Sequence, residues 1–256
     1  MKITQQHRRE QLILQREALI LAASFGRKLY RERKRLLKET INQLMKIPVN
    51  DWQQQAPLLL NEPYLFDLFE KMYIKVGEPI ARKTVNEFMG FKSENVWERA
   101  IRKWISQNGG RKVTLINDSL KEWFRKELGT VLNTTQDGLR LGVEDMVELL
   151  KSKLNIEYPQ ILDYQVRRIV QTESLTSLSV AANESVKELG MNYTATWGIT
   201  GNNTRPAHQA MDGVEADESG MFYPDGEQME YPRDDRYGAS AGNIINCSCF
   251  VIYSPK

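Results

Sequence analysis

The sequence predicts an α+β protein, with a predominantly helical N-terminal body followed by a small, loop-rich α+β C-terminal module. Apolar residues recur at helical spacing through most of residues 1–190. After Gly190, two short runs alternate in the manner of strands, and turn formers such as Asp212-Gly213 separate them. The chain of 256 residues is 41% hydrophobic, which is enough to bury a core.

The first expected element is a basic helix over 10–46, which Pro48 terminates. Residues 1–46 hold 12 Lys/Arg against 4 Asp/Glu, a net of +8 in a chain whose total is only +2. Such a face is most often simply solvated, but it can also bind DNA phosphates or an acidic protein surface. The basic residues opposite its apolar stripe are Arg27, Lys28, Arg31, Arg33, Lys34, Arg35 and Lys38.

A Gln- and Pro-rich linker is expected over 48–63, followed by helices over 64–154. The periodic segments in that range are 64–76, 79–88, 96–107, 115–132 and 143–154, with Asn108-Gly109-Gly110 as a break. A long helix over 158–189 completes the helical part. These shifts predict two domains, a helical N-terminal region over 1–157 and a second module over 158–256.

The tail over 191–256 is expected to hold strands over 193–199 and within 243–253. It carries 4 Lys/Arg against 9 Asp/Glu, a net of −5. A module of about 65 residues is marginally stable on hydrophobic burial alone. A metal ion, or packing on the helices, would therefore help to stabilise it.

Several protein classes are excluded by composition. No apolar run approaches the ~18 residues of a membrane-spanning helix, so no membrane segment is expected. The N-terminus lacks the apolar region of a secretory signal, which predicts synthesis in the cytoplasm. Both cysteines lie in Cys247-Ser248-Cys249, so a disulfide framework is excluded.

One histidine and two cysteines in the loop-rich tail form a candidate metal site. Thiolate and imidazole are the ligands that zinc prefers, so His208, Cys247 and Cys249 predict a structural zinc ion, with Asp212 or water as fourth ligand. The single residue between the cysteines is an unusual spacing for zinc. Two free thiols, or a strained disulfide across one residue, remain open alternatives.

A catalytic interpretation of the same region is weaker. Arg205 and His208 on one helical turn would suit an anionic substrate. No nucleophile triad, glycine-rich phosphate loop or paired-carboxylate signature accompanies them, so a structural role for His208 is favoured. Glu173, inside the long helix, is expected to be solvated or paired with Arg167 or Arg168.

A series of residues in a fixed order spans about 90 positions of the second module: Arg168, Thr172, Glu173, Trp197, Thr204, Arg205, His208, Asp212, Gly213, Phe222, Pro232, Asn246, Cys247 and Cys249. Taken together, these residues resemble the Mu-F-like phage head morphogenesis family, the minor capsid or minor head proteins. The departures are Gly201 and Asn203, where the family has an acidic and a basic residue, and Ser248, where it has Arg. The similarity does not extend to the N-terminal 160 residues.

The resemblance implies a low-copy virion protein in the phage head interior or at the portal vertex. It would act in procapsid morphogenesis and in genome packaging or delivery. The implied partners are the portal protein and a capsid or scaffold protein, with non-specific double-stranded DNA as a further partner. No enzymatic activity is expected. The alternative is a small nuclease- or ribosyltransferase-like enzyme that acts on nucleic acid or nucleotide through Arg205 and His208.

Overall fold

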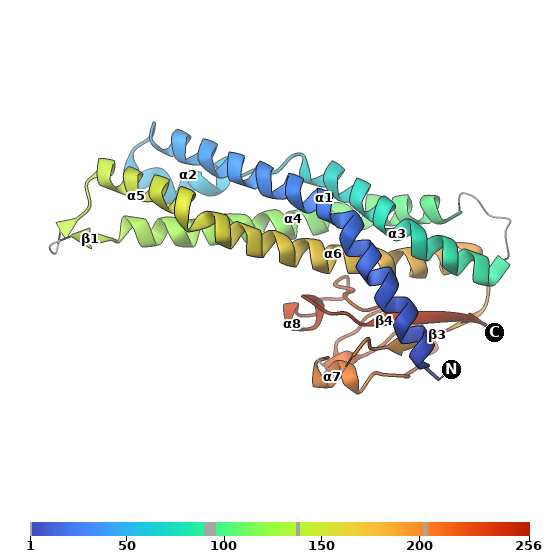
Figure 1. Ribbon diagram of the computed structural model, residues 1–256. Helices are drawn as coiled ribbons and strands as arrows, with labels where there is room; N and C mark the ends of the chain where they lie inside the picture. The colour runs from blue at the N-terminus through green and yellow to red at the C-terminus, as the bar shows by residue number, and fades with distance from the viewer. Residues whose placement is uncertain (1, 90–95, 137–138, 202–203) are drawn as a thin grey trace. The chain divides into compact units, whose positions relative to one another are not determined.

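The computed structural model describes residues 2–89, 96–136, 139–201 and 204–256 (Figure 1). Helices account for 69% of the described residues, which confirms the predicted fold class of a mostly helical body with a small α+β module. Within this described part of the chain, no helix is both long and apolar enough to span a membrane.

Long helices dominate the first three quarters of the chain, and short elements follow (Figure 1). The helices in this part of the chain are α1 (Gln5–Leu44), α2 (Trp52–Leu59), α3 (Leu65–Met89), α4 (Val96–Leu132), α5 (Val143–Ile156) and α6 (Tyr158–Leu189). The short helices are α7 (Pro206–Gln209), α8 (Ala241–Ile244) and the 3₁₀ turns η1 (Val49–Asp51) and η2 (Pro224–Gly226). The strands are β1 (Thr135–Gln136), β2 (Leu139–Arg140), β3 (Tyr193–Gly198) and β4 (Phe250–Pro255).

The expected linker over 48–63 is largely helical, which corrects the sequence prediction. Trp52, Ala56 and Leu60 recur every four residues and are all fully buried. This apolar stripe gives the Gln-rich segment one inward face, and the Trp52 indole N–H donates to the Ile47 carbonyl at 3.2 Å. Burial of that face outweighs the Pro and Gln composition from which a linker was predicted.

Two expected helix breaks are also absent. The segments 64–76 and 79–88 form the single helix α3, with Pro79 inside it, and Val76 and Ile80 are buried on either side. Helix α4 likewise runs through Gly109-Gly110 without interruption. A glycine costs a helix only about 1 kcal/mol, and long buried faces on both sides of the pair offset that cost.

The chain folds into two compact units that are interleaved along the sequence. The first unit comprises 1–24, 69–108 and 168–256, and the second comprises 25–68 and 109–167. The long helices α1, α3, α4 and α6 each contribute to both units. The sequence-based boundary between residues 157 and 158 separates two consecutive segments, whereas these two units are interleaved along the chain. That boundary stays a prediction.

The second unit has a large, almost wholly apolar core. Its members come from α1, α2, α4, α5 and α6 and include Leu37, Trp52, Phe124, Leu150 and Tyr158. One ion pair is buried with them. Arg33 and Glu62 are both fully buried and form a two-pronged hydrogen bond at 3.0 and 2.9 Å.

The first unit is built around the C-terminal half of α6, where every residue from 172 to 183 is buried. Many of these residues are Ser, Thr and Ala, whose small side chains let neighbouring helices approach closely. At the tightest point, a Cβ on Gly77 of α3 would lie 2.9 Å from the Cβ of Ala181. Only glycine fits there, so this position fixes how α3 crosses α6 within the unit.

The sheet of the first unit positions the candidate site. Strands β3 and β4 pair antiparallel, with Trp197 opposite Val251 and Gly198 opposite Phe250. The expected strand over 193–199 is confirmed. In the region 243–253, a helical turn, α8, precedes the strand β4. The far edge of β3 is covered because the Trp197 N–H donates to the Val214 carbonyl at 2.8 Å.

Candidate metal centre

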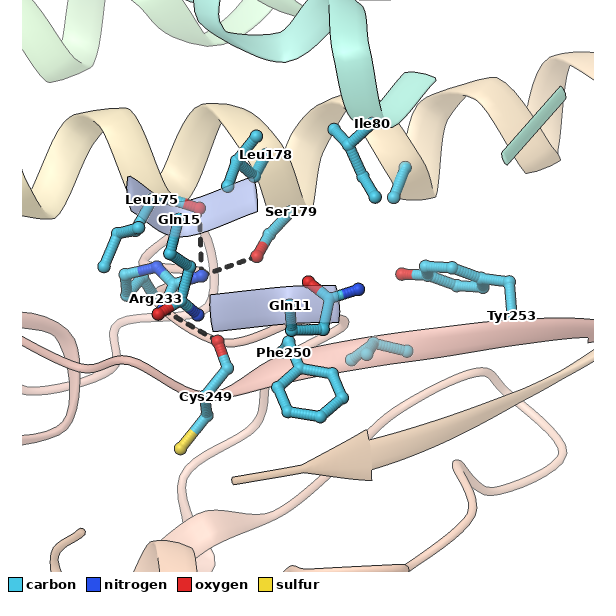
Figure 2. Close-up of a pocket in the computed structure, with 12 residues that line it drawn as sticks. Gln11, Gln15, Ile80, Leu175, Leu178, Ser179, Arg233, Cys249, Phe250 and Tyr253 are labelled. Carbon is cyan, nitrogen blue, oxygen red and sulfur yellow. Dashed lines mark hydrogen bonds between the residues drawn. The ribbon is translucent and has the colours of Figure 1, made fainter. Parts of the chain in front are cut away.

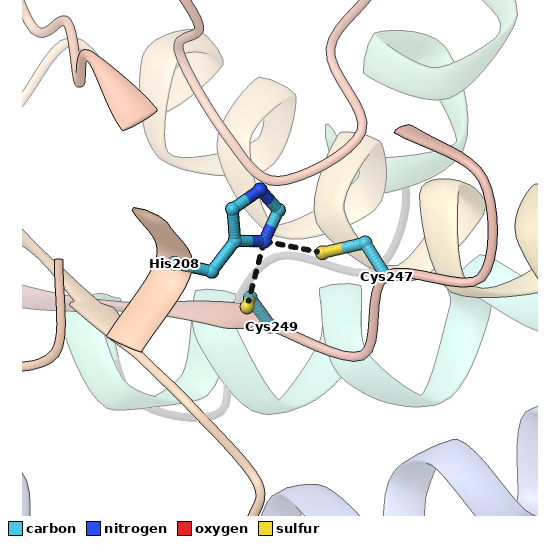
Figure 3. A group of neighbouring side chains, drawn as sticks. All are labelled: His208, Cys247 and Cys249. Atoms are coloured by element: carbon cyan, nitrogen blue, oxygen red, sulfur yellow. Dashed lines mark hydrogen bonds between the residues drawn. The ribbon is translucent and has the colours of Figure 1, made fainter. Parts of the chain in front are cut away.

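Two chain segments bring His208, Cys247 and Cys249 together. His208 lies on the one-turn helix α7, which begins at Pro206, and the cysteines lie in the turn that leads into β4. The Nδ1 atom of His208 lies 3.4 Å from each Sγ atom, as Figure 3 shows. The potential ligand atoms of all three residues lie within 4.8 Å of one another, and the side chains are 1%, 2% and 1% exposed. The cluster could hold a metal ion.

The donor set is compatible with zinc in its chemistry and in its two Sγ–Nδ1 distances. Zinc binds sulfur at about 2.3 Å and imidazole nitrogen at about 2.0–2.1 Å, so tetrahedral ligands lie about 3.5–3.7 Å apart. The two observed Sγ–Nδ1 distances of 3.4 Å come close to that separation. Both sulfur atoms therefore reach the same nitrogen, although only one residue separates the cysteines.

The imidazole of His208 is held from its far side. Its Nε2 lies 3.0 Å from Oδ1 of Asn243, a buried residue of α8. The Asn243 amide in turn donates to Oε2 of Glu227 at 2.8 Å. Because Asn243 presents an acceptor, Nε2 carries the proton and Nδ1 keeps its lone pair for a ligand. Metal-binding histidines are commonly oriented in this way by a hydrogen-bond acceptor behind the ring.

The Cys-Ser-Cys turn is fastened to α6 by a buried arginine. Nη1 of Arg233 donates to the carbonyls of Cys247 at 2.6 Å and Cys249 at 3.0 Å. Its Nη2 donates to the Leu175 carbonyl at 2.9 Å and to Ser179 Oγ at 2.7 Å, as Figure 2 shows. Arg233 is 2% exposed, so these bonds form in a low-dielectric interior where each is strong.

Charge and hydrogen bonding make the two thiols unequal. The Cys249 thiol, the His208 ring and the Arg233 charge together hold the pKa of Cys247 well below its usual range, against the opposing effect of burial. The neighbouring Cys247 raises the pKa of Cys249, and burial acts in the same direction. One sulfur thus favours the thiolate form that metals bind, and a bound cation would favour it at the other.

Thr172 of α6 and Asn246 of the turn before β4, two residues on which the resemblance rests, contact each other. The backbone N–H of Asn246 donates to Thr172 Oγ1 at 3.3 Å. Asn246 adopts a left-handed backbone conformation with φ of 57°, which Asn tolerates better than most residues. This turn sets the direction in which Cys247 enters the cluster.

Asp212, expected as a possible fourth ligand, is engaged elsewhere. Its Oδ1 accepts from the Ile199 N–H at 3.1 Å, and its Oδ2 accepts from Arg8 of α1 at 2.6 Å. Gly213 follows in a left-handed conformation with φ of 81°, and its N–H donates to the Trp197 carbonyl at 2.8 Å. The fully buried Trp197 ring then packs edge-on to His208 at 5.7 Å. These residues build the wall of the centre.

Two other motif residues have structural partners. A guanidinium N–H of Arg205 donates to the Ile245 carbonyl, two residues before Cys247. Glu173 is buried, and its carboxylate accepts from the Tyr73 hydroxyl of α3 at 2.7 Å, so the expectation of a solvated residue is wrong. Arg168 is half-buried in α6. Asn203, one of the departures from the family pattern, lies outside the described residues.

The basic face of α1 is as predicted except at one position. Arg27, Lys28, Arg31, Lys34, Arg35 and Lys38 are exposed. Arg33 is instead fully buried against Glu62, because its position on the helix faces the core of the second unit. Arg35 is occupied in part by Glu32 and Glu39 on the same helix, at 2.9 and 2.8 Å. Five exposed cations therefore have no ion pair among the pairs described, and Arg33 cannot contact DNA.

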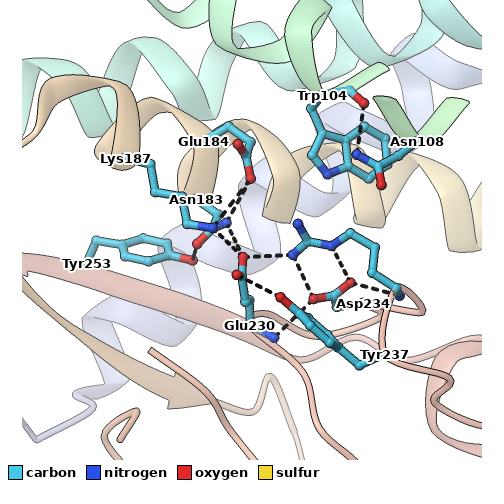
Figure 4. Close-up of polar contacts among 10 residues, drawn as sticks. Trp104, Asn108, Asn183, Glu184, Lys187, Glu230, Asp234, Tyr237 and Tyr253 are labelled. Atoms are coloured by element: carbon cyan, nitrogen blue, oxygen red, sulfur yellow. Dashed lines mark hydrogen bonds and ion pairs between the residues drawn. The ribbon is translucent and has the colours of Figure 1, made fainter. Parts of the chain in front are cut away.

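A second polar cluster lies beside α6 (Figure 4). Its centre is Glu230, whose Oε2 accepts from Asn183 at 3.1 Å, from Arg236 at 2.7 Å and from Lys187. Asp234 accepts three hydrogen bonds from Arg236 and one from the Glu230 N–H. Burial raises the pKa of Glu230, but Lys187 and Arg236 outweigh it and lower the pKa to about 2.

The sequence predicts the three clustered side chains but not the residues that support them, namely Asn243, Glu227, Arg233 and Gln15. Gln15 of α1 donates to the carbonyl of Ser248, between the two cysteines, at 2.9 Å. None of these residues stands in a recognisable motif, because what they contribute is a contact to a backbone atom or to a ring nitrogen. A polar residue inside an otherwise apolar helical stripe, as at Gln15, is the one signal available. The chain matches no protein-family model, no curated protein and no solved structure.

Proposed function

We propose that this chain is a structural phage-head protein of the Mu-F-like minor head type, stabilised by a zinc ion bound to His208, Cys247 and Cys249. Its site would be the portal vertex or head interior, and its partners the portal and a capsid or scaffold protein. The role would be procapsid morphogenesis together with genome packaging or delivery.

The observation that carries the proposal is the convergence of the motif on one centre. Residues that resemble the family lie on α6, β3, α7 and the final turn. Thr172 bonds the turn residue Asn246, Trp197 packs on His208, and His208 meets both cysteines. A chance resemblance spread over separate segments would have no reason to assemble a single contact network.

The zinc part rests on the donor set and on the polar residues behind it. Two thiolates would neutralise the charge of Zn²⁺, and the imidazole would be the third protein ligand. Bound zinc would cross-link α7 to the start of β4. A module this small gains limited stability from apolar burial, so such a cross-link would add to it. Water is the candidate for the fourth position, since Asp212 is bound to Ile199 and Arg8.

Metal analysis tests the zinc part directly. Protein purified without added metal should contain about one zinc ion per chain, and Cys247→Ser should contain far less and melt at a lower temperature. Ser248→Ala is the matched control, because it changes the residue between the ligands and keeps both thiols. Wild-type protein with little zinc, and no change in melting temperature for Cys247→Ser, would contradict the proposal.

Binding to a portal ring tests the phage part. The full chain should co-sediment with portal rings encoded beside it in the same genome, and binding should weaken as salt rises if the basic face contributes. Replacing Arg27, Arg31 and Lys38 by Ala should then weaken binding and reduce its salt dependence. If the chain binds neither the portal nor the capsid protein, the structural role would be contradicted. The zinc result would not be affected by that outcome.

The enzyme alternative stays a prediction without a specific observation in its favour. It needs His208 and Arg205 to face a substrate. His208 is 1% exposed with both ring nitrogens near partners, and Arg205 is bonded to the Ile245 carbonyl. Incubation with RNA, DNA and nicotinamide dinucleotide, with His208→Ala as the control, would reveal such an activity.

A further inference from the structure

The outer face of α1 in the first unit exposes a concentrated aliphatic surface. Four large aliphatic side chains within nine residues are exposed: Leu12 by 36%, Ile13 by 55%, Leu19 by 37% and Ile20 by 74%. Exposed aliphatic residues are normally scattered singly, and a contiguous group marks an interaction surface. We refer to these four residues, together with Arg9 and Arg16, as the outer face of α1.

This face is held outward by contacts that the rest of the helix surface makes. Ala18 and Ala22 are buried at 1% and 0%, and Gln15 donates to the Ser248 carbonyl at 2.9 Å. Arg8 bonds Asp212 at 2.6 Å. Turning the aliphatic residues inward would break all of these contacts and expose the alanines. Something outside the first unit must therefore cover the outer face if it is to be buried.

The spacing of the outer face matches that of a helical partner. Leu12 and Leu19 are seven residues apart, and so are Ile13 and Ile20, which gives two short rows along the helix. A repeat of seven residues keeps the same side chains facing a second helix that packs alongside. Strands present side chains with a period of two and have no such repeat.

The charge on the outer face selects the chemistry of that partner. At 3.6 residues per turn, Arg9 and Arg16 fall between the leucine row and the isoleucine row, and both are exposed. Among the described residues, neither forms an ion pair. A second copy of this helix would oppose arginine to arginine, and a lipid surface would meet guanidinium groups in the middle of the apolar face. An acidic helix satisfies both features.

We propose that the outer face of α1 is a docking site for an amphipathic helix that presents aliphatic residues with Glu or Asp between them. The aliphatic rows would bury apolar surface, and the carboxylates would pair with Arg9 and Arg16. Glu17, exposed beside the isoleucine row, would disfavour acidic residues on that side and so fix the register. This site is distinct from the basic residues 27–38 and needs neither bound metal nor a phage partner.

The test uses the full chain and two synthetic helices of about 21 residues, which is three heptads. Both carry Leu at heptad positions a and d, and they differ only in having Glu or Lys at the positions that face Arg9 and Arg16. Fluorescence anisotropy should show the Glu peptide binding about tenfold more tightly than the Lys peptide. The double variant Arg9→Glu/Arg16→Glu should reverse that preference.

Single variants distinguish binding at the outer face of α1 from non-specific hydrophobic binding elsewhere on the protein. Ile20→Glu should weaken binding of the Glu peptide about tenfold or more. Ile156→Glu is the matched control, because Ile156 is 67% exposed but lies on α5, and it should leave binding unchanged. Circular dichroism melting should show that both variants stay folded, as expected for exposed positions.

Three results would overturn the proposal. The first is equal binding of the Glu and Lys peptides, or no reversal in the double variant. The second is self-association of the chain that Ile20→Glu abolishes, which would make a second copy the occupant. The third is Ile20-dependent binding to vesicles containing anionic lipid, with no binding of either peptide.

Discussion

The second unit and the tail over 191–256 are stabilised in different ways. The second unit buries a continuous set of aliphatic and aromatic side chains from five helices, and one ion pair, Arg33–Glu62, is buried with them. The tail buries apolar residues of its own, among them Trp197, Phe222, Met229 and Phe250. It differs from the second unit in having several buried polar contacts as well: the His208–Cys247–Cys249 cluster, the four bonds of Arg233, and the network around Glu230. A larger share of its stability therefore rests on specific polar atoms.

This difference predicts that the two regions fail under different treatments. Apolar burial is spread over many residues, so no single solute can remove it. A chelator can remove a bound metal ion, and acid can protonate the carboxylates of a hydrogen-bond network and so break its ion pairs. Chelation, core mutation and acid should therefore each act on one region more than on the other.

Metal removal should produce the largest difference. Chelation should cost the tail about 5 kcal/mol or more, less than the ~10–16 kcal/mol of peptides that fold only with zinc, because packing on α6 remains. Hydrogen exchange should show loss of protection across β3 and β4, with the amides of α5 unchanged. Uniform loss in both regions, or none in either, would show that the centre does not hold the tail separately.

Phe124→Ala tests the opposite case. Phe124 is fully buried in the apolar core of the second unit, so its loss should cost about 3–5 kcal/mol through lost burial and the cavity left behind. Zinc content should stay the same as in the wild type, as measured by metal analysis of the folded fraction. A zinc content that falls with Phe124→Ala would mean that the two regions are not energetically separate.

Asn243→Ala should have a smaller effect that is confined to the centre. Without the acceptor at Nε2, His208 loses its fixed tautomer and orientation, and zinc affinity should fall about 10–100-fold. Competition with a metallochromic chelator measures this. Asn243→Asp combined with Glu227→Gln keeps the acceptor at Nε2 and a hydrogen bond between residues 243 and 227, so it should retain affinity near that of the wild type. Equal losses in this double variant and in Asn243→Ala would indicate a general packing defect.

The helical part could be predicted from periodicity because burial there follows the 3.6-residue repeat. The errors came where tertiary packing overrides a local signal. Judged from the local sequence alone, Gly109-Gly110 and Pro79 predict helix breaks. Helices α4 and α3 nevertheless continue through these positions because the segments on either side have buried apolar faces. From the sequence, Arg33 is expected to be one of a row of exposed cations. In the structure it is buried and bonded to Glu62, which lies 29 residues away in the sequence. Such a partner leaves no trace in local sequence.

The candidate site could be predicted only as far as its three clustered side chains. His208, Cys247 and Cys249 are recognisable because few other residue types bind soft metals. Arg233 and Asn243 were missed because any arginine or asparagine in a loop looks alike, and only the fold shows that they face a backbone carbonyl or an imidazole. The α1 contact through Gln15 joins residues 233 positions apart, beyond the reach of any spacing argument.

Titration of Glu230 by acid should produce the smallest effect, and it should act on the tail. The pKa of Glu230 is about 2 in the folded chain, lowered from 4.5 by Lys187 and Arg236 against the effect of burial. Its carboxylate therefore stabilises the fold above pH ~4.5, and that contribution is lost as the pH falls toward 2. With allowance for partial screening by solvent, the loss is about 1–2 kcal/mol. Unfolding of the metal-free protein by urea at pH 5 and pH 3, which keeps acid release of zinc out of the comparison, should show this difference in the wild type and a smaller one in Glu230→Gln. An identical pH dependence in both would assign the acid sensitivity to other carboxylates.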